Sequence, residues 1–239
     1  KTKSGKINGT LLESYDKDVL LIKLDSGYNL GIKKDEIESI KVTGKAEKHR
    51  EKIEAKENKK VPHIGMIITG GTISSRLDYE TGGVKWLMKP EEILNFAPKM
   101  FDVARISRIE KPFMLASENM SAREWKILAE KTAELLNKPE NKGVIITHGT
   151  DTLHYTASAL SFMLKNASKP VVLTYAQRST DRGSSDTALN LVCSAHAALS
   201  DIAEVMLVGH GSINDEFCLA IRGTKVRKMH TSRRDTFRP

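Results

Sequence analysis

Thr72 is the first residue of this sequence placed where it could support covalent chemistry. It follows Gly70 and Gly71, which end the apolar run 63–68 abruptly. The run is short and partly β-branched, so it predicts a buried strand. Two adjacent glycines allow a sharp turn and a close approach to a ligand. A threonine hydroxyl presented there could act as a nucleophile, although a plain turn after a strand would have the same pattern.

A second loop has the same pattern with an added carboxylate. Residues 143–148 predict another buried strand, and residues 149–152 follow it directly as Gly-Thr-Asp-Thr. Capping of the next helix by Thr or Asp is the simpler explanation of this loop taken alone. Open α/β sheets bind ligands at the carboxyl ends of their strands. Two such loops on neighbouring strands would therefore place Thr72, Thr150 and Asp151 around one crevice.

The elements that must position these loops alternate between strand and helix from Pro62 onward. Apolar runs predict strands at residues 63–68, 103–109, 143–148, 170–175 and 203–209. Helices are predicted at residues 90–96, from 121 to about 137, from the 149–152 loop to about 165, and from about 185 to 199. A capping box formed by Ser121 and Glu124 opens the second of them. Strands separated by helices predict an α/β fold with a parallel sheet.

Residues 1–44 predict a separate small β domain. Strand-like runs occupy residues 6–12, 18–24 and 28–32, with a hairpin turn at 25–27 and a fourth predicted strand at 37–42. An SH3-like barrel fits this pattern, and the abrupt start of the chain leads us to expect that its first strand is missing. Residues 45–60 carry mixed charge, which favours a solvated linker or an exposed helix over an RNA-binding tail. We expect domain boundaries at 1–44, 45–60 and 61–239.

The composition sets broad limits on function. The 239 residues are 39% hydrophobic and 28% charged, which is typical of a soluble globular protein. The apolar runs fall short of the ~20 residues that a membrane-spanning helix needs. A net charge of +8 permits an acidic partner such as RNA without requiring one. Cys193 and Cys218 predict free, buried thiols in a reducing cytoplasm. The histidines lack zinc-ligand spacing, so we expect no metal site.

Two motifs resemble those of the bacterial-type L-asparaginase family. They are residues 69–74, Thr-Gly-Gly-Thr-Ile-Ser, and residues 146–152, Ile-Thr-His-Gly-Thr-Asp-Thr. Residues 117–120 and 169–173 support the resemblance, which extends from about residue 61 to the end of the chain. It implies the Rossmann-like parallel sheet of the N-terminal asparaginase lobe. It also implies a second, smaller α/β lobe beyond residue 239, so we expect this chain to be a fragment that cannot work alone.

The resemblance assigns roles to residues that match the motifs. Thr72 resembles the nucleophile that attacks a side-chain carboxamide. Thr150, Asp151 and Lys228 resemble the triad that activates the nucleophile or water. Lys228 is chosen by aligning residues 228–232, Lys-Met-His-Thr-Ser, with the lysine-containing turn of the family.

Further positions have roles implied in the same way. Ser117 and Glu118 match positions that hold the α-carboxylate and α-amino groups of the substrate. Tyr79 resembles a loop tyrosine that orients the nucleophile, although the loop from Thr72 is shorter here than in the bacterial enzymes. Lys225 remains the alternative to Lys228.

The implied chemistry agrees with the residue types. A threonine hydroxyl is a poor nucleophile until a base takes its proton. A lysine can be that base if burial or a nearby cation lowers its pKa. Backbone N–H groups of glycine-rich turns can stabilise the tetrahedral oxyanion. The products are ammonia and an acyl-enzyme that water then hydrolyses.

Three features resemble one branch of the family, the D subunits of archaeal glutamyl-tRNA(Gln) amidotransferases. They are the N-terminal β domain and the stretches 176–186 and 227–235. The resemblance implies release of ammonia from Gln or Asn for a partner, the amidotransferase E subunit, which binds Glu-tRNA(Gln) and uses ATP and Mg. It also implies a homodimer within a heterotetramer. A free-standing cytoplasmic L-asparaginase with an appended β domain and a non-catalytic binding module remain alternatives.

Overall fold

The computed structural model divides the chain into two compact units. One comprises Lys1–Lys52 and Leu77–Val84, and the other comprises Ile53–Arg76 and Lys85–Pro239. The structure describes residues 1–3, 5–12, 18–24, 29–44, 60–77, 84–86 and 90–239. The predicted turn at 25–27, nearly all of the predicted linker 45–60, and Tyr79 lie outside the described residues.

The smaller unit contains a three-stranded antiparallel sheet. Its strands are β1 (Thr10–Leu12), β2 (Val19–Lys23) and β3 (Asn29–Lys33), with β2 in the middle, and a 3-10 helix, η1 (Lys34–Glu36), follows. These strands confirm the three that were predicted. The fourth predicted strand, 37–42, is wrong: Ile37 forms only an isolated bridge with Thr2. Ile40 and Val42 are 61% and 77% exposed, so the partial alternation there does not reflect a buried face.

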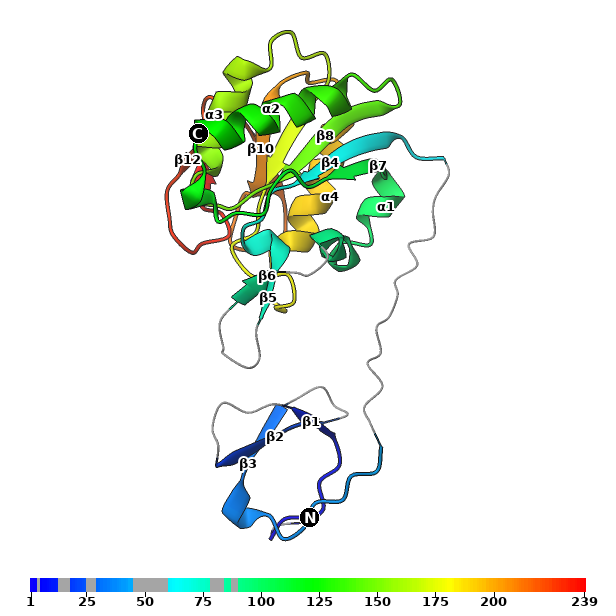
Figure 1. Ribbon diagram of the computed structural model, residues 1–239, viewed down its shortest axis with the longest axis vertical. Coiled ribbons are helices and arrows are strands. Elements are labelled where there is room, and N and C mark those ends of the chain that lie inside the picture. Colours follow the sequence, from blue (N-terminus) through cyan, green and yellow to red (C-terminus); the bar gives the residue numbers. More distant parts are fainter. Residues whose placement is uncertain (4, 13–17, 25–28, 45–59, 78–83, 87–89) are drawn as a thin grey trace. The chain divides into compact units, whose positions relative to one another are not determined.

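The larger unit is built on a six-stranded sheet in the order β11-β10-β9-β8-β4-β7 (Figure 1). The strands are β4 (His63–Ile68), β7 (Arg105–Glu110), β8 (Asn141–Thr147), β9 (Val171–Thr174), β10 (Val205–His210) and β11 (Cys218–Arg222). Five neighbouring strands are parallel, which confirms the α/β fold. The sixth, β11, is antiparallel to β10 and was not predicted.

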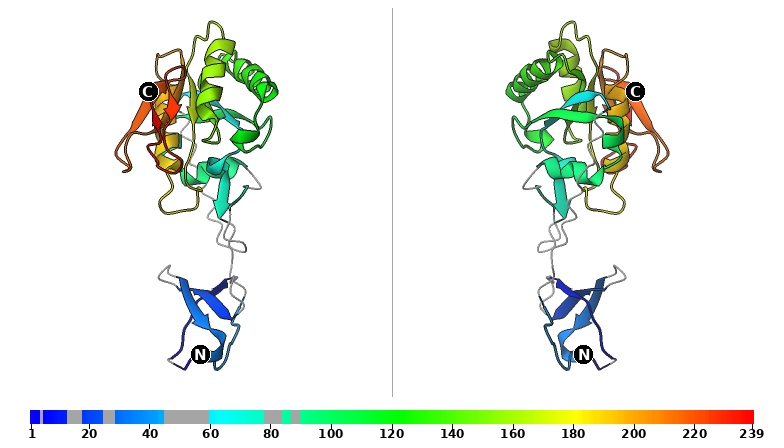
Figure 2. Two further views of the ribbon diagram at one scale, coloured as in Figure 1. Left: turned by 90° about the vertical axis from the view of Figure 1, so that its left-hand side faces the viewer. Right: turned by 90° about the vertical axis from the view of Figure 1, so that its right-hand side faces the viewer.

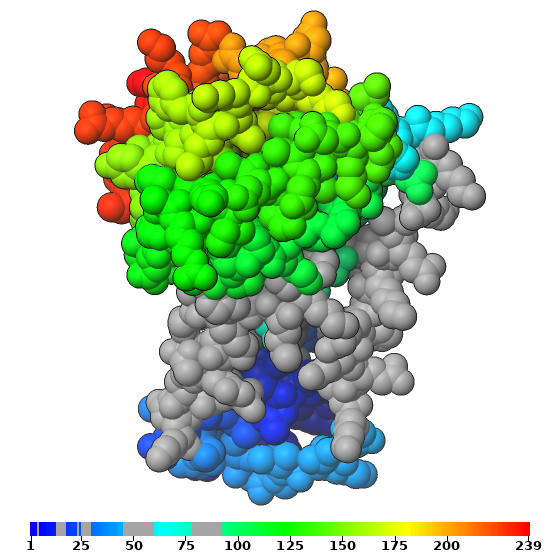
Figure 3. Space-filling view, turned by 45° about the horizontal axis from the view of Figure 1, so that its top comes forward, coloured from blue at the N-terminus to red at the C-terminus, as the bar shows by residue number. Residues whose placement is uncertain are grey.

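Helices cover both faces of this sheet. Helices α2 (Ala122–Leu136) and α3 (Leu153–Met163) lie on one face, and α1 (Met100–Val103) and α4 (Thr187–Ala198) lie on the other (Figures 1 and 2). Helices α2 and α3 together form a continuous outer surface (Figure 3). The predicted capping box opens α2, with the Ser121 N–H donating to Glu124 Oε2 at 2.9 Å. The predicted helix at 90–96 is a 3-10 helix, η3 (Pro90–Phe96).

The core has two layers because neighbouring side chains of a strand point to opposite faces. In β8, Ile145 packs in the cluster under α1 and α4, whereas Val144 and Ile146 pack in the cluster under α2 and α3. Burial on both faces explains why the strands read as continuous apolar runs. Parallel β4, β8 and β9 all end at the same edge of the sheet, so the loops that follow them meet there.

The structure also contains several short elements. They are the 3-10 helices η2 (Thr72–Ser74) and η4 (Ser117–Asn119) and the strands β5 (Ser75–Leu77), β6 (Val84–Trp86), β12 (Arg227–Lys228) and β13 (Phe237–Arg238).

The two cysteines, Cys193 and Cys218, are free thiols, and they are half-buried rather than fully buried as predicted. Among the described residues, none of the helices has the length and apolar character to cross a membrane.

Candidate active site

The turn that carries Thr72 packs directly on the turn that carries Thr150. Gly70 and Gly71 have positive φ angles of 110° and 78°, which favour glycine. A Cβ at Gly71 would lie 2.3 Å from Gly149 Cα. The absence of a side chain at Gly71 therefore allows the two turns to touch. Thr72 follows at once as the first, half-buried residue of η2.

The side chains that follow Gly149 do not cap helix α3. The N-cap of α3 is Thr152, and no side chain caps it. The Thr152 hydroxyl instead donates to the carbonyl oxygen of Ser117 at 2.7 Å. Thr150 is 6% exposed, whereas Asp151 is exposed. The simpler explanation of this loop, helix capping, therefore does not account for its hydroxyl and carboxylate groups.

Lys228 joins this turn from a distant part of the sequence. Its ammonium group donates to Thr150 Oγ1 at 2.9 Å and to Asp151 Oδ1 at 2.8 Å. The Lys228 side chain is 11% exposed, and that of Asp151 is 61% exposed. The alternative, Lys225, is exposed in the turn before β12. The structure thus brings together Thr150, Asp151 and Lys228.

The end of the described chain holds Lys228 in place. Lys228 in β12 pairs with Phe237 in β13. Phe237 is 2% exposed and packs edge-on against Tyr175, with 4.7 Å between the ring centroids. The Tyr175 hydroxyl also donates to the carbonyl oxygen of Arg234 at 2.6 Å. Tyr175 follows β9, so the sheet itself anchors the segment that carries the lysine.

The structure places the remaining predicted site residues as follows. Ser117 is buried, and its hydroxyl oxygen accepts the N–H groups of Asp151 and Thr152 at 3.1 and 3.4 Å. It therefore shapes the turn, while its own hydrogen can still be donated. Glu118 is exposed beside it. Tyr79 lies outside the described residues.

His148 supports the same turn, which the sequence did not indicate. Its Nδ1 lies 2.7 Å from the carbonyl oxygen of Gly149, so Nδ1 must carry the hydrogen. Its Nε2 then accepts from the Thr156 hydroxyl at 2.9 Å, and Trp125 Nε1 donates to that hydroxyl. Complete burial lowers the pKa of His148 to about 4. His148 is therefore a neutral structural residue.

The loop at 176–186 also reaches the site. The buried Asp186 carboxylate accepts the backbone N–H groups of Gln177 and Arg178 at 2.9–3.1 Å. Burial raises the pKa of Asp186 above the ordinary value. Gln177 Oε1 lies 3.5 Å from Thr150 Oγ1. The only sequence signal for Gln177 was that the stretch 176–186 resembles the amidotransferase D subunits.

These contacts define what the site can do chemically. Thr150 and Lys228 form a hydroxyl–amine pair within hydrogen-bonding distance, which can relay a proton. Thr72 lies on the adjoining turn. The site therefore offers a hydroxyl group that could act as a nucleophile, a hydroxyl–amine pair that could relay a proton, and an exposed carboxylate that could hold a cationic group.

Known proteins are similar to this chain in sequence and in fold. The family described as "Asparaginase, N-terminal" matches residues 63–239. This chain belongs to the asparaginase family. The "GatD N-terminal domain" matches residues 1–43 of this asparaginase-family chain.

Individual relatives agree with that assignment. The glutamyl-tRNA(Gln) amidotransferase D subunit of Pyrococcus furiosus is 52% identical over 232 residues, which are 95% of this chain and 52% of the relative. Its counterpart from Archaeoglobus fulgidus is 44% identical over 237 residues, covering 99% and 55%. The thermostable L-asparaginase from Thermococcus kodakarensis superposes with a TM-score of 0.64 at 30% identity, covering 74% of this chain and 50% of that structure. This asparaginase-family chain thus spans about half the length of these relatives.

Proposed function

We propose that this chain carries the amide-hydrolysing site of a tRNA-dependent amidotransferase. The site releases ammonia from the side-chain amide of Gln or Asn. The observation that supports this most directly is the contact of Lys228 with both Thr150 and Asp151, beside the turn that presents Thr72. The relatives named as amidotransferase D subunits support the assembly in which the ammonia is used.

In the proposed reaction, Thr72 Oγ1 attacks the carboxamide carbon. Its proton passes through the Thr150 hydroxyl to Lys228, which must first be in the neutral amine form. The carboxamide nitrogen then takes this proton back from Lys228 through the Thr150 hydroxyl and leaves as ammonia, and an ester to Thr72 remains. Thr150 and Lys228 then activate a water molecule that hydrolyses the ester. Backbone N–H groups at the glycine turns stabilise the oxyanion.

The remaining site residues hold the substrate. Ser117 and Glu118 bind its α-carboxylate and α-amino groups, and Asp151 shares the ammonium group. Tyr79 orients the nucleophile. The reaction at this site uses no cofactor of its own.

The proposal includes a cytoplasmic assembly. The amidotransferase E subunit, as the partner, binds Glu-tRNA(Gln), activates the glutamyl group with ATP and Mg, and combines it with the ammonia. The D subunits form a homodimer within a heterotetramer. The net charge of +8 is compatible with an RNA-containing assembly.

The decisive experiment measures ammonia release by the full-length protein, alone and with the partner subunit purified from the native source. Glutaminase activity that rises strongly when charged Glu-tRNA(Gln) is added supports the amidotransferase. Vigorous hydrolysis of Asn or Gln by the protein alone would support a free-standing asparaginase instead. No hydrolysis in the reconstituted assembly would leave a binding module and reject the proposal.

A further inference from the structure

The loop at 176–186 connects the two threonine turns of the site. On one side, the N–H and the hydroxyl of Thr180 donate to the carbonyl oxygen of Ser75, at 3.2 and 3.0 Å. On the other side, the Gln177 side chain faces Thr150. Asp186 holds the intervening backbone through the N–H groups of Gln177 and Arg178. The loop is thus fixed by its main chain and by Thr180.

The Gln177 side chain does something other than hold this loop. Its Oε1 contacts the Thr150 hydroxyl, while its Nε2 is buried and has no hydrogen-bond partner among the described residues. A buried carboxamide that serves only as structure normally has both ends satisfied. Within the described part of the chain, the Gln177 side chain therefore has Thr150 as its hydrogen-bonding partner.

The Thr150 hydroxyl has one hydrogen and two lone pairs. Lys228 Nζ donates to Oγ1, so the hydroxyl hydrogen must point elsewhere. Gln177 Oε1, at 3.5 Å, is the acceptor on that side. The distance is long for a hydrogen bond, as catalytic contacts often are before substrate binds.

We propose that Gln177 is a positioning residue that orients the Thr150 hydroxyl. In the resting site, its Oε1 accepts the hydroxyl hydrogen and holds Thr150 Oγ1 beside Lys228 Nζ. For the relay, this hydrogen turns from Gln177 to the neutral amine, while Oγ1 keeps its place and can accept the proton of Thr72. This inference rests on the proposed function, because it gives Gln177 a role in the relay that serves Thr72.

The test uses the full-length protein in its partner assembly and compares four forms: the native protein, Gln177→Met, Thr150→Val and the double variant. Methionine has a similar length but cannot accept the hydroxyl hydrogen. We expect Gln177→Met to lower kcat on the order of tenfold with KM nearly unchanged. In the Thr150→Val background, the same change should have almost no effect, because Gln177 acts through that hydroxyl.

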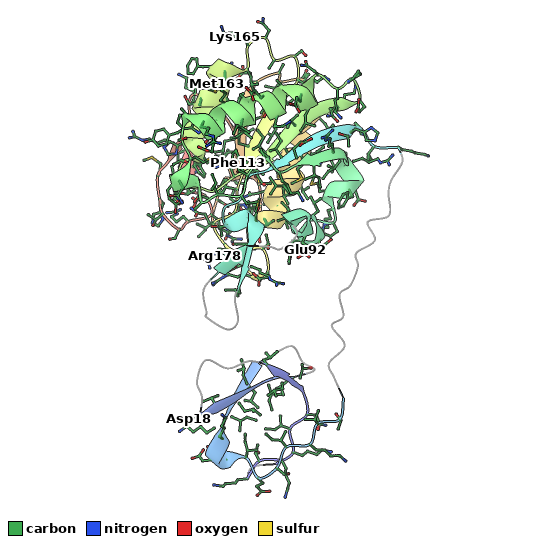
Figure 4. The ribbon with its side chains drawn as sticks, viewed as in Figure 1. Asp18, Glu92, Phe113, Met163, Lys165 and Arg178 are labelled. Carbon is green, nitrogen blue, oxygen red and sulfur yellow. The ribbon has the colours of Figure 1, made fainter. Side chains whose placement is uncertain are left out.

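The neighbouring residue provides a matched control. Arg178, which is labelled in Figure 4, shares the same Asp186 anchor through its N–H. Its exposed side chain donates instead from Nη1 to Ser184 Oγ at 3.3 Å. Arg178→Met should leave kcat unchanged. An equal loss from Gln177→Met in both backgrounds, or a normal kcat in the native background, would overturn the inference.

Unfolding midpoints of the same four proteins provide a readout that does not need activity. Contact between the two side chains predicts that the shifts in midpoint are not additive. Additive shifts would overturn the inference even if the enzyme is active. If the native assembly hydrolyses no amide, the proposed function fails and the catalytic role of Gln177 fails with it. Normal native activity, lost in Thr72→Ala but kept in Gln177→Met, would reject the inference alone.

Discussion

Replacing Gly71 by alanine should separate the two turns on which the proposed chemistry depends. Gly71 has φ 78° and ψ 177°, a backbone region essentially restricted to glycine. Its missing Cβ would lie 2.3 Å from Gly149 Cα and 2.4 Å from Gly149 N. These neighbours are backbone atoms, so no side chain can rotate away to relieve the clash.

Two contributions set the size of the effect. The backbone conformation costs a non-glycine residue about 1–3 kcal/mol. Relief of the clash by a shift of packed backbone costs about 1–3 kcal/mol more. The free energy of unfolding of the α/β unit should fall by their sum, about 2–6 kcal/mol. At roughly 2–4 °C per kcal/mol for a unit of this size, Tm should fall by about 4–24 °C.

Thermal unfolding and amide hydrolysis by the full-length assembly test this prediction. A displacement of the Thr72 turn by about 1 Å should reduce kcat on the order of 100-fold. Gly183→Ala is the control, because a Cβ there meets no atom within 4 Å, and it should change Tm by less than about 2 °C. If Gly71→Ala has the stability and kcat of this control, contact between the turns is not required and the reasoning is refuted.

Four further predictions address the nucleophile, the relay, the buried histidine and the anchor of the lysine. Thr72→Ala should lower amide hydrolysis on the order of 10³-fold or more in steady-state kinetics, with normal circular dichroism; near-normal turnover would reject the nucleophile. Lys228→Met and Thr150→Val should be similarly damaging, and the double variant little worse; losses that multiply would show that they do not act as a unit. The pKa of His148 is lowered from 6.5 to about 4, so its neutral form stabilises the fold above pH 6.5. That stability, about 3 kcal/mol, should be lost as the pH falls toward 4 in urea unfolding, and a non-titrating His148→Gln variant with the same pH slope would contradict this. Phe237→Ala should lower the free energy of unfolding by about 3–5 kcal/mol, and an unchanged urea midpoint would show that Phe237 does not anchor β12.

The parallel strands could be predicted because their burial leaves a direct trace in the sequence. Residues 143–148 and 170–175 are continuous apolar runs since both faces of the sheet are covered. β11 was missed because it is an edge strand on which only Ile221 is buried. The predicted strand at 37–42 was wrong because its apolar residues Ile40 and Val42 are exposed, so the apolar pattern there does not mark a buried strand.

The site was predictable where chemistry and local pattern coincide. Thr72 and Thr150 each follow a buried strand and a glycine, and the structure places their turns in contact. The partners of these turns could not be worked out locally. Lys228 is 78 residues from Thr150, and Gln177 is 27 residues from it. Contacts over such separations depend on strand order and register, which no short-range pattern specifies.

The exposure of the site residues explains how one arrangement can serve both structure and reaction. The Asp151 side chain is 61% exposed, whereas that of its partner Lys228 is 11% exposed. Water can therefore solvate the carboxylate, which leaves it free to exchange partners with an incoming ammonium group. The parts that must not move are buried instead: Ser117 and His148 fix the turn of Thr150, and Phe237 fixes the strand of Lys228. Rigid buried supports combined with an exposed carboxylate allow the proposed site to bind substrate without disturbing the relay beneath it.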